Sequence, residues 1–204
     1  MIAVVTGGSG GLGRAICDEL RGRGYEVRSW SRSDGVDAAD ETAVREAAAD
    51  LEDWRVLVNN AAVLVPKPIV DTSLEDWDAT LAAGLTAAFL CSREAFRRMR
   101  PGGAIVNVCS LSGVRDAEKF AGMAAYVAAK SGLAGLTEAL AVEGRELGIR
   151  VNAVSPGSID TPMLALSGAP REPVLDPADV ARVIGWLAAP ESAPLTSANL
   201  RMDP

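Results

Sequence analysis

Short apolar runs rich in β-branched residues recur along the chain, and longer stretches with a helical repeat separate them. The predicted strands lie at residues 1–6, 26–30, 56–59, 103–109, 150–155 and 195–202. In the longer stretches apolar positions recur every three or four residues, which is typical of helices with one buried face. The predicted helices lie at residues 14–23, 77–99, 124–147 and 177–188. Alternating strands and helices predict an α/β fold, a doubly wound parallel sheet with helices on both faces.

The chain is long enough for one domain with a sizeable core, and no proline-, glycine- or serine-rich linker divides it. Its 204 residues are therefore expected to form a single domain, residues 1–204. The net charge is −7 and no basic cluster occurs, so nucleic acid is not expected as a partner. No apolar run approaches the roughly 20 residues that span a bilayer, so no association with a membrane is expected.

Histidine is absent, which excludes Ser-His-Asp hydrolysis, Cys-His chemistry and zinc sites built on histidine. The three cysteines, Cys17, Cys91 and Cys109, are odd in number, lack metal-ligand spacing and follow no signal peptide. We therefore expect reduced, buried thiols, a cytoplasmic protein and no bound metal. Any proton transfer must use another side chain.

A glycine-rich turn, TGGSGGLG, follows the first predicted strand directly and precedes the first predicted helix. Strand, glycine turn and helix in this order form the Rossmann-type dinucleotide fingerprint. Glycines permit a tight turn and a close approach to the pyrophosphate, and the helix N-terminus offers N–H groups to phosphate. The residues of this turn predicted to bind the cofactor are Gly7, Ser9, Gly11, Leu12 and Gly13. A purely structural glycine loop is the alternative.

Tyr126 and Lys130, in the sequence YVAAK, lie four residues apart in a predicted helix and therefore on the same side of it. A free phenol has a pKa near 10 and is a poor base at neutral pH. An adjacent ammonium favours the phenolate and lowers that pKa, which suits the tyrosine to proton transfer with a hydroxyl or carbonyl group. An ordinary surface pair is the alternative at this spacing.

Five ordered motifs resemble those of the short-chain dehydrogenase/reductase family over nearly the whole chain. They are TGGSGGLG, NNAA, IVNVCSLSG, YVAAK and RVNAVSPGSIDTPM, and they are similar to those of members that reduce 3-oxoacyl groups on an acyl carrier protein. The resemblance implies that Tyr126 is the catalytic acid/base, that Lys130 binds the nicotinamide ribose and lowers the tyrosine pKa, and that Ser110 holds the substrate carbonyl. The competing serine, Ser112, is interpreted as a loop hydroxyl.

The resemblance also implies where the rest of the cofactor binds. The matching residues are Asn60 and Ala61 beside the adenosine ribose, the adenine-contacting Asp37 with its neighbour Ala38, and Pro156, Gly157, Ile159 and Thr161 around the nicotinamide amide. Arg32, which follows the second predicted strand between two serines, resembles the family's NADP-binding members because guanidinium binds phosphate in a fork. Asp34 close by, and Gly10 where many such members carry a basic residue, keep NAD as the alternative.

The sequence departs from the family pattern at three places. The helix that usually joins the second and third strands is missing between Arg32 and Val36, and residues 35–40 are predicted to be the third strand. Gly84 stands where relatives commonly place an asparagine that anchors a water and the active-site lysine, which predicts a weakened proton relay. Only residues 162–175 separate the nicotinamide loop from the next predicted helix, which predicts an open substrate pocket.

These observations predict an NADP(H)-dependent oxidoreductase that interconverts a carbonyl and a secondary alcohol. The substrate is expected to be a small-molecule or carrier-tethered carbonyl compound. The resemblance implies a homo-oligomer, a dimer or tetramer built on the two long helices. Two alternatives remain open: a noncatalytic nucleotide-binding sensor or partner of another enzyme, favoured by Gly84 and the missing helix, and an enzyme of the same fold that catalyses dehydration or epimerisation.

Overall fold

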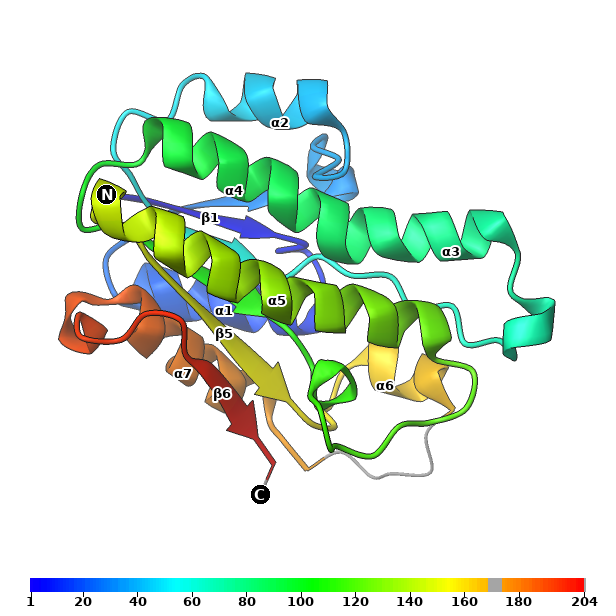
Figure 1. Cartoon of the computed structure of the whole chain (residues 1–204). Helices are drawn as coiled ribbons and strands as arrows, with labels where there is room; N and C mark the ends of the chain where they lie inside the picture. Colours follow the sequence, from blue (N-terminus) through cyan, green and yellow to red (C-terminus); the bar gives the residue numbers. More distant parts are fainter. Residues whose placement is uncertain (169–173, 204) are drawn as a thin grey trace.

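The central sheet is parallel throughout in the computed structural model, which describes residues 1–168 and 174–203 (Figure 1). The strands described are β1 (Ile2–Thr6), β2 (Glu26–Trp30), β3 (Trp54–Asn59), β4 (Ala104–Val108), β5 (Arg150–Pro156) and β6 (Asn199–Met202). Their order across the sheet is β2-β1-β3-β4-β5-β6, so the predicted doubly wound parallel sheet is confirmed. The order reverses between β1 and β3, and ligands bind to such sheets at the carboxyl ends of the strands beside that point.

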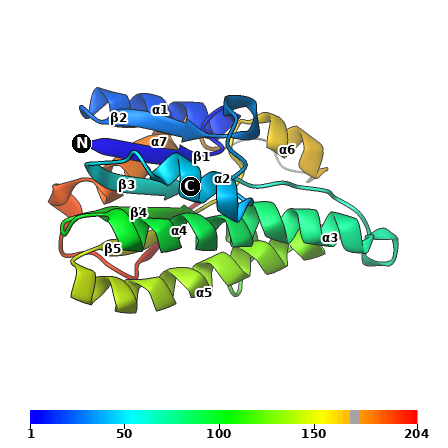
Figure 2. The same ribbon diagram turned by 90° about the horizontal axis from the view of Figure 1, so that it is seen from above.

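Helices cover both faces of the sheet, as Figure 2 shows from above. The helices α1 (Gly11–Gly22) and α7 (Pro177–Ala188) pack on one face, and α2 (Glu41–Ala48), α4 (Ala87–Arg98) and α5 (Ala124–Leu147) pack on the other. Two further helices are α3 (Leu74–Leu81), which leads toward α4, and α6 (Pro162–Ser167), which follows β5. Both α5 and α7 have the predicted bounds, whereas α1 begins three residues earlier than predicted and α2 and α6 were not predicted.

Successive residues of a central strand pack into different cores because strand side chains alternate between the two faces. Val58 of β3 packs with Ile16 of α1 and Ile184 of α7. Its neighbour Leu57 packs with Leu90 of α4 on the opposite face. Helices therefore pack against both faces of β3, and this packing fixes the point at which the loop after β3 begins.

The prediction of a strand at residues 35–40 is wrong. A 3-10 turn, Arg32–Asp34, follows β2 and ends at Gly35, whose φ of 85° is in the left-handed region. The Asp37 carboxylate then accepts a hydrogen bond from the Ala39 N–H at 2.9 Å, and the Asp40 carboxylate caps α2 by accepting from the Ala43 N–H. Aspartates that bond their own backbone favour turns over strands. No α-helix lies between Arg32 and Val36, as predicted, but because the strand expected at residues 35–40 is absent, α2 joins β2 to β3, and β2 is left as the edge of the sheet.

The helix predicted at residues 77–99 is divided by a π-helical turn. Residues 82–86 adopt this turn between α3 and α4, and the chain continues through it without a break in direction (Figure 1). Gly84 lies at the centre of the turn and is buried. A Cβ at Gly84 would lie 3.2 Å from the Ala129 Cβ of α5, so the glycine allows the two helices to approach closely.

A ladder of buried polar side chains crosses the sheet just behind the carboxyl ends of β3 and β4. The Asn59 amide donates to Asn107 Oδ1 at 2.8 Å and to the Ser92 hydroxyl of α4 at 3.1 Å. The Asn107 amide in turn donates to the Thr137 hydroxyl of α5 at 2.9 Å. These bonds tie two strands to the two helices that face them.

The three cysteines are buried and form no disulfide, as expected. None of the described helices is long and apolar enough to cross a bilayer. Within the described ranges, histidine, cysteine and carboxylate side chains form no group of three that could hold a metal ion. The central part of the short segment 162–175, residues 169–173, lies outside the described residues.

Candidate functional site

The glycine turn between β1 and α1 has a shape that requires glycine. Gly7 has a φ of 64°, and its N–H donates to the Trp30 carbonyl of β2 at 2.8 Å. A Cβ at Gly13 would lie 2.1 Å from the Gly7 carbonyl oxygen, far inside any allowed contact. Helix α1 begins at Gly11, and the N–H groups of a first helical turn have no partners within the helix. The turn therefore presents unpaired N–H groups of the kind that bind phosphate.

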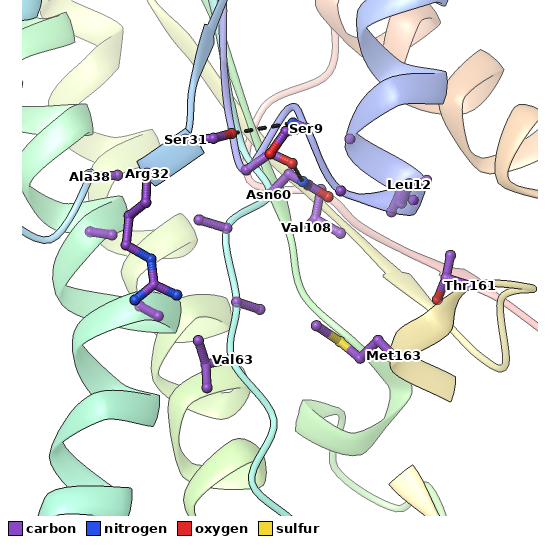
Figure 3. Close-up of a pocket in the computed structure, with 18 of the residues that line it drawn as sticks. Ser9, Leu12, Ser31, Arg32, Ala38, Asn60, Val63, Val108, Thr161 and Met163 are labelled. Atoms are coloured by element: carbon purple, nitrogen blue, oxygen red, sulfur yellow. Dashed lines mark hydrogen bonds between the residues drawn. The ribbon is translucent and has the colours of Figure 1, made fainter. Parts of the chain in front are cut away.

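A cleft of about 920 Å³ runs along the carboxyl ends of the strands over this turn. Every residue predicted from the sequence to bind the cofactor or to act in catalysis lines it. They are Gly7, Ser9, Gly11, Leu12, Gly13, Arg32, Asp37, Ala38, Asn60, Ala61, Ser110, Tyr126, Lys130, Pro156, Gly157, Ile159 and Thr161. In Figure 3, Arg32 extends into the cleft on the side of Ala38 and Val63, and Thr161 and Met163 lie at the other end.

Some cleft residues were missed by the sequence prediction. Four alanines of the α3–α4 region line the cleft, and the recurrence of alanine about every four residues, at 79, 82 and 83, and 87, is the signal that could have revealed them. They are Ala79, Ala82, Ala83 and Ala87. Asn60 lines the cleft, but its amide donates to the carbonyls of Thr6 and Gly7, each at 3.1 Å. Its side chain thus braces the glycine turn.

Hydroxyl groups and one guanidinium surround the end of β2. The Ser33 hydroxyl donates to the Ser9 hydroxyl at 3.0 Å. The Ser9 N–H donates to the Ser31 hydroxyl at 3.2 Å, as Figure 3 shows. The Asp34 carboxylate accepts from the Ser29 hydroxyl at 2.6 Å and does not line the cleft. Across the described part of the chain, no hydrogen bond or ion pair engages the exposed Arg32 guanidinium. The Arg32 guanidinium is thus available to an anion at this end of the cleft, where the Asp37 carboxylate also lies.

Ser110, Tyr126 and Lys130 lie together at the other end of the cleft. Ser110 follows β4 and accepts a hydrogen bond from the Ser112 N–H at 3.1 Å through its hydroxyl oxygen. The Lys130 ammonium lies 5.7 Å from the centre of the Tyr126 ring and donates to the Val108 carbonyl at 2.6 Å. The predicted carbonyl-binding serine thus lies in the same part of the cleft as the predicted acid/base pair.

Burial controls the pKa values of this pair. It raises the pKa of Tyr126 to about 12, and a hydrogen bond with Ser110 only partly offsets the rise. It lowers the pKa of Lys130 to about 8, because its side chain is 2 % exposed and the charged form loses its hydration. The causes of the Tyr126 shift include no contribution from the Lys130 charge, so the lowering of the tyrosine pKa by the lysine stays a prediction.

Comparisons with known proteins show the family of the chain. The family whose model matches residues 35–204 is described as Enoyl-(Acyl carrier protein) reductase. The chain is 33 % identical to the acetoacetyl-CoA reductase of Allochromatium vinosum, over 98 % of this chain and 95 % of that protein. It is also 34 % identical to an uncharacterized short-chain type dehydrogenase/reductase, y4vI, of Sinorhizobium fredii, over 99 % of this chain but 43 % of that longer protein.

Among solved structures, the chain resembles a short chain dehydrogenase from Burkholderia cenocepacia in complex with NADP. The TM-score is 0.87 at 30 % identity, over 98 % of this chain and 95 % of that one. The chain belongs to the short-chain dehydrogenase/reductase family. It is accordingly an enzyme of the oxidoreductase class.

A second cavity, of about 430 Å³, adjoins the cleft in this family member. Ser110 and Tyr126 line both cavities. The second cavity is bordered by apolar side chains from the loop after β3, from the segment between β4 and α5 and from α6, and by charged residues at the end of β6. These residues include Leu64, Leu111, Phe120, Met123, Met163 and Leu164, together with Arg201 and Asp203. No sequence motif reveals these residues, because the fold brings them together from separate segments of the chain.

Proposed function

We propose that the protein is an NADP(H)-dependent oxidoreductase that interconverts a carbonyl group and a secondary alcohol. The position of Ser110 and Tyr126, where the 920 Å³ cleft meets the 430 Å³ cavity, carries the proposal. Residues at such a junction can act on a substrate carbonyl in one cavity while a cofactor lies in the other. When bound, a nicotinamide cofactor would supply the hydride to the carbonyl carbon or accept it from the alcohol.

The cleft residues fit a nicotinamide dinucleotide along their whole length. The glycine turn and the start of α1 suit the pyrophosphate, because the missing side chains leave backbone N–H groups accessible. Lys130 would bind the nicotinamide ribose near Tyr126, and Pro156 to Thr161 would hold the amide. Residues 36–39 border the adenine end as a turn, although the expected strand is absent.

The end of β2 supports NADP over NAD. A 2′-phosphate needs a cation and a hydrogen-bond donor, which the Arg32 guanidinium and the Ser9 hydroxyl provide at this end of the cleft. An acidic residue aimed at the ribose would favour NAD instead. Asp34 does not fill that role, because Ser29 holds its carboxylate away from the cleft.

A protonated Tyr126 phenol can serve as the acid in the reductive direction. With a pKa of about 12 the phenol keeps its proton at neutral pH and can donate it to the carbonyl oxygen. Ser110 would donate a second hydrogen bond to the same oxygen. Its own oxygen already accepts from the Ser112 N–H, which leaves the hydroxyl hydrogen available. Two donors aimed at a developing alkoxide are a typical source of transition-state stabilisation.

The lining of the second cavity supports a class of substrate. The mixed apolar and charged lining of the second cavity suits a carbonyl compound with an apolar portion, either free or tethered to a carrier.

The two long helices carry exposed apolar side chains, namely Phe89 of α4 and Val142 and Leu147 of α5. They support a homo-oligomer that packs these helices together.

Calorimetric titration with NADPH and NADH tests the proposal without a known substrate. Wild-type protein should bind NADPH more tightly. Arg32→Ala should weaken NADPH binding by roughly 10- to 100-fold, because hydrogen bonds to charged groups contribute about 1.5–3 kcal/mol, and should leave NADH nearly unchanged. Arg28→Ala is the matched control, since Arg28 lies four residues earlier on β2, pairs with Glu26 and does not line the cleft.

Three outcomes would count against parts of the proposal. Tighter binding of NADH would refute the cofactor preference, and binding of neither would refute the nucleotide site. Turnover of a ketone panel with NADPH should be lost in Tyr126→Phe while NADPH binding persists. A wild-type protein that binds NADPH but reduces nothing in the panel would favour the noncatalytic alternative.

A further inference from the structure

Gly113 lies in backbone contact with the helix that carries the catalytic pair. It ends the 3-10 turn Leu111–Gly113, which directly follows Ser110. A Cβ at Gly113 would lie 2.6 Å from the Lys130 carbonyl carbon and 2.8 Å from both the Lys130 Cβ and its carbonyl oxygen. Real Cβ atoms essentially never come this close, so only glycine allows the turn to rest on α5 at this point.

Hydrogen bonds connect this contact to the Ser110 side chain. The Ser131 hydroxyl of α5 donates to the Gly113 carbonyl at 3.2 Å. The Gly113 N–H donates to the Ser110 carbonyl at 2.9 Å, and the Ser112 N–H donates to the Ser110 hydroxyl oxygen at 3.1 Å. The position of Gly113 against Lys130 therefore fixes the position of Ser110.

We propose that Gly113 and Ser131 are positioning residues that set the gap between the Ser110 hydroxyl and the Tyr126–Lys130 pair. The proposal rests on the proposed function, in which Ser110 and Tyr126 bind one carbonyl oxygen. Neither residue reaches that oxygen. They act through the distance between the turn and the helix.

The turn rather than the helix should yield when this contact is enlarged. Helix α5 extends over 24 residues and packs on the sheet and on α4, whereas the turn has three residues. An added methyl group at Gly113 would push the turn away by roughly 1 Å before an ordinary contact is restored. A misplacement of about 1 Å can cost on the order of 100-fold in rate, because the reacting groups must be held in a near-attack geometry.

Gly113→Ala is the direct test, and Gly135→Ala is its matched control. Gly135 lies on α5, and a Cβ there would meet nothing within 4 Å. We expect Gly113→Ala to lower kcat by about 100-fold while the NADPH Kd stays within about threefold, because α5 and Lys130 do not move. Ser131→Ala should lower kcat by a smaller factor, and Ser131→Thr, which keeps the hydroxyl, should restore it. Gly135→Ala should match the wild type.

A second readout needs no substrate. The chain has two tyrosines, so in a Tyr25→Phe background a ¹³Cζ-tyrosine label reports on Tyr126 alone. Since Tyr126 is hydrogen-bonded to Ser110, Gly113→Ala should shift this NMR resonance and Gly135→Ala should not.

The proposal is overturned if Gly113→Ala keeps kcat within threefold and leaves the resonance in place. It is also overturned if kcat, NADPH affinity and melting temperature fall together, which would indicate a merely structural role. If the wild type binds NADPH but reduces no carbonyl, the proposed function fails. The NMR comparison then decides the positioning role separately.

Discussion

Lys130 should destabilise the folded protein at neutral pH, and the size of this effect can be worked out. Its side chain is 2 % exposed, and burial lowers its pKa from 10.5 to about 8. Holding the charged form in the fold therefore costs about 3 kcal/mol, since each pKa unit corresponds to about 1.4 kcal/mol. Lys130→Met removes this cost, but it also leaves the buried Val108 carbonyl without its donor, which costs about 1–3 kcal/mol.

The change with pH separates these two opposing contributions. Because the folded-state pKa lies below the unfolded one, the cost is fully present below pH 8 and is relieved as the pH rises from about 8 toward 10.5. The loss of the hydrogen bond does not vary in this way. Between about pH 7 and about pH 9.5 the wild type should therefore gain about 2 kcal/mol of unfolding free energy relative to Lys130→Met.

Urea unfolding of both proteins at the two pH values, in reducing buffer, measures this difference. Tyr126→Phe is the control from the same pocket. The pKa of Tyr126 is about 12, and unfolded tyrosine titrates near 10, so its stability difference should change by only a few tenths of a kcal/mol. A Lys130→Met difference that is equally flat would refute the buried-charge argument.

Two further predictions concern α4 and α5. Burial would raise the pKa of Glu94, but hydrogen bonds from Arg98 and Arg97 outweigh burial and lower this pKa below its usual value of 4.5. Glu94→Gln should therefore destabilise the protein at neutral pH. In urea unfolding, the stability difference from the wild type should vanish as the pH falls through the native pKa of Glu94. Light scattering should give the mass of a dimer or tetramer, and Val142→Glu should reduce it; a monomeric wild type would contradict packing through the exposed apolar residues of these helices.

The sequence predicts elements well where local chemistry decides them. Helix α7 has its predicted bounds because Pro177 opens it and the Asp176 carboxylate accepts from the Ala178 N–H at 2.7 Å. The strand expected at residues 35–40 is wrong because a strand needs a partner, and no pattern within six residues reports one. The hydrogen bond within Asp37–Ala39 favours the turn instead.

In the candidate site, too, local motifs reveal some residues, whereas other contacts depend on how distant segments pack. Motif positions such as Tyr126 and Ser110 meet in the cleft because their spacing and the sheet order bring them there. The Lys130 acceptor is the backbone carbonyl of Val108, and no side-chain motif can reveal a backbone partner. The π-helical turn at Gly84 and the contact of Gly113 with Lys130 likewise depend on how two segments pack.

The edge position of β2 has a consequence for self-association. An edge strand carries a row of unpaired N–H and C=O groups, which can template the addition of a strand from another molecule and lead to aggregation. Glu26 and Arg28 are exposed on this strand and form an ion pair at 2.5 Å. An incoming strand would have to bury or displace these charges. The shortened connection after β2 thus leaves an open edge that the strand's own charges protect.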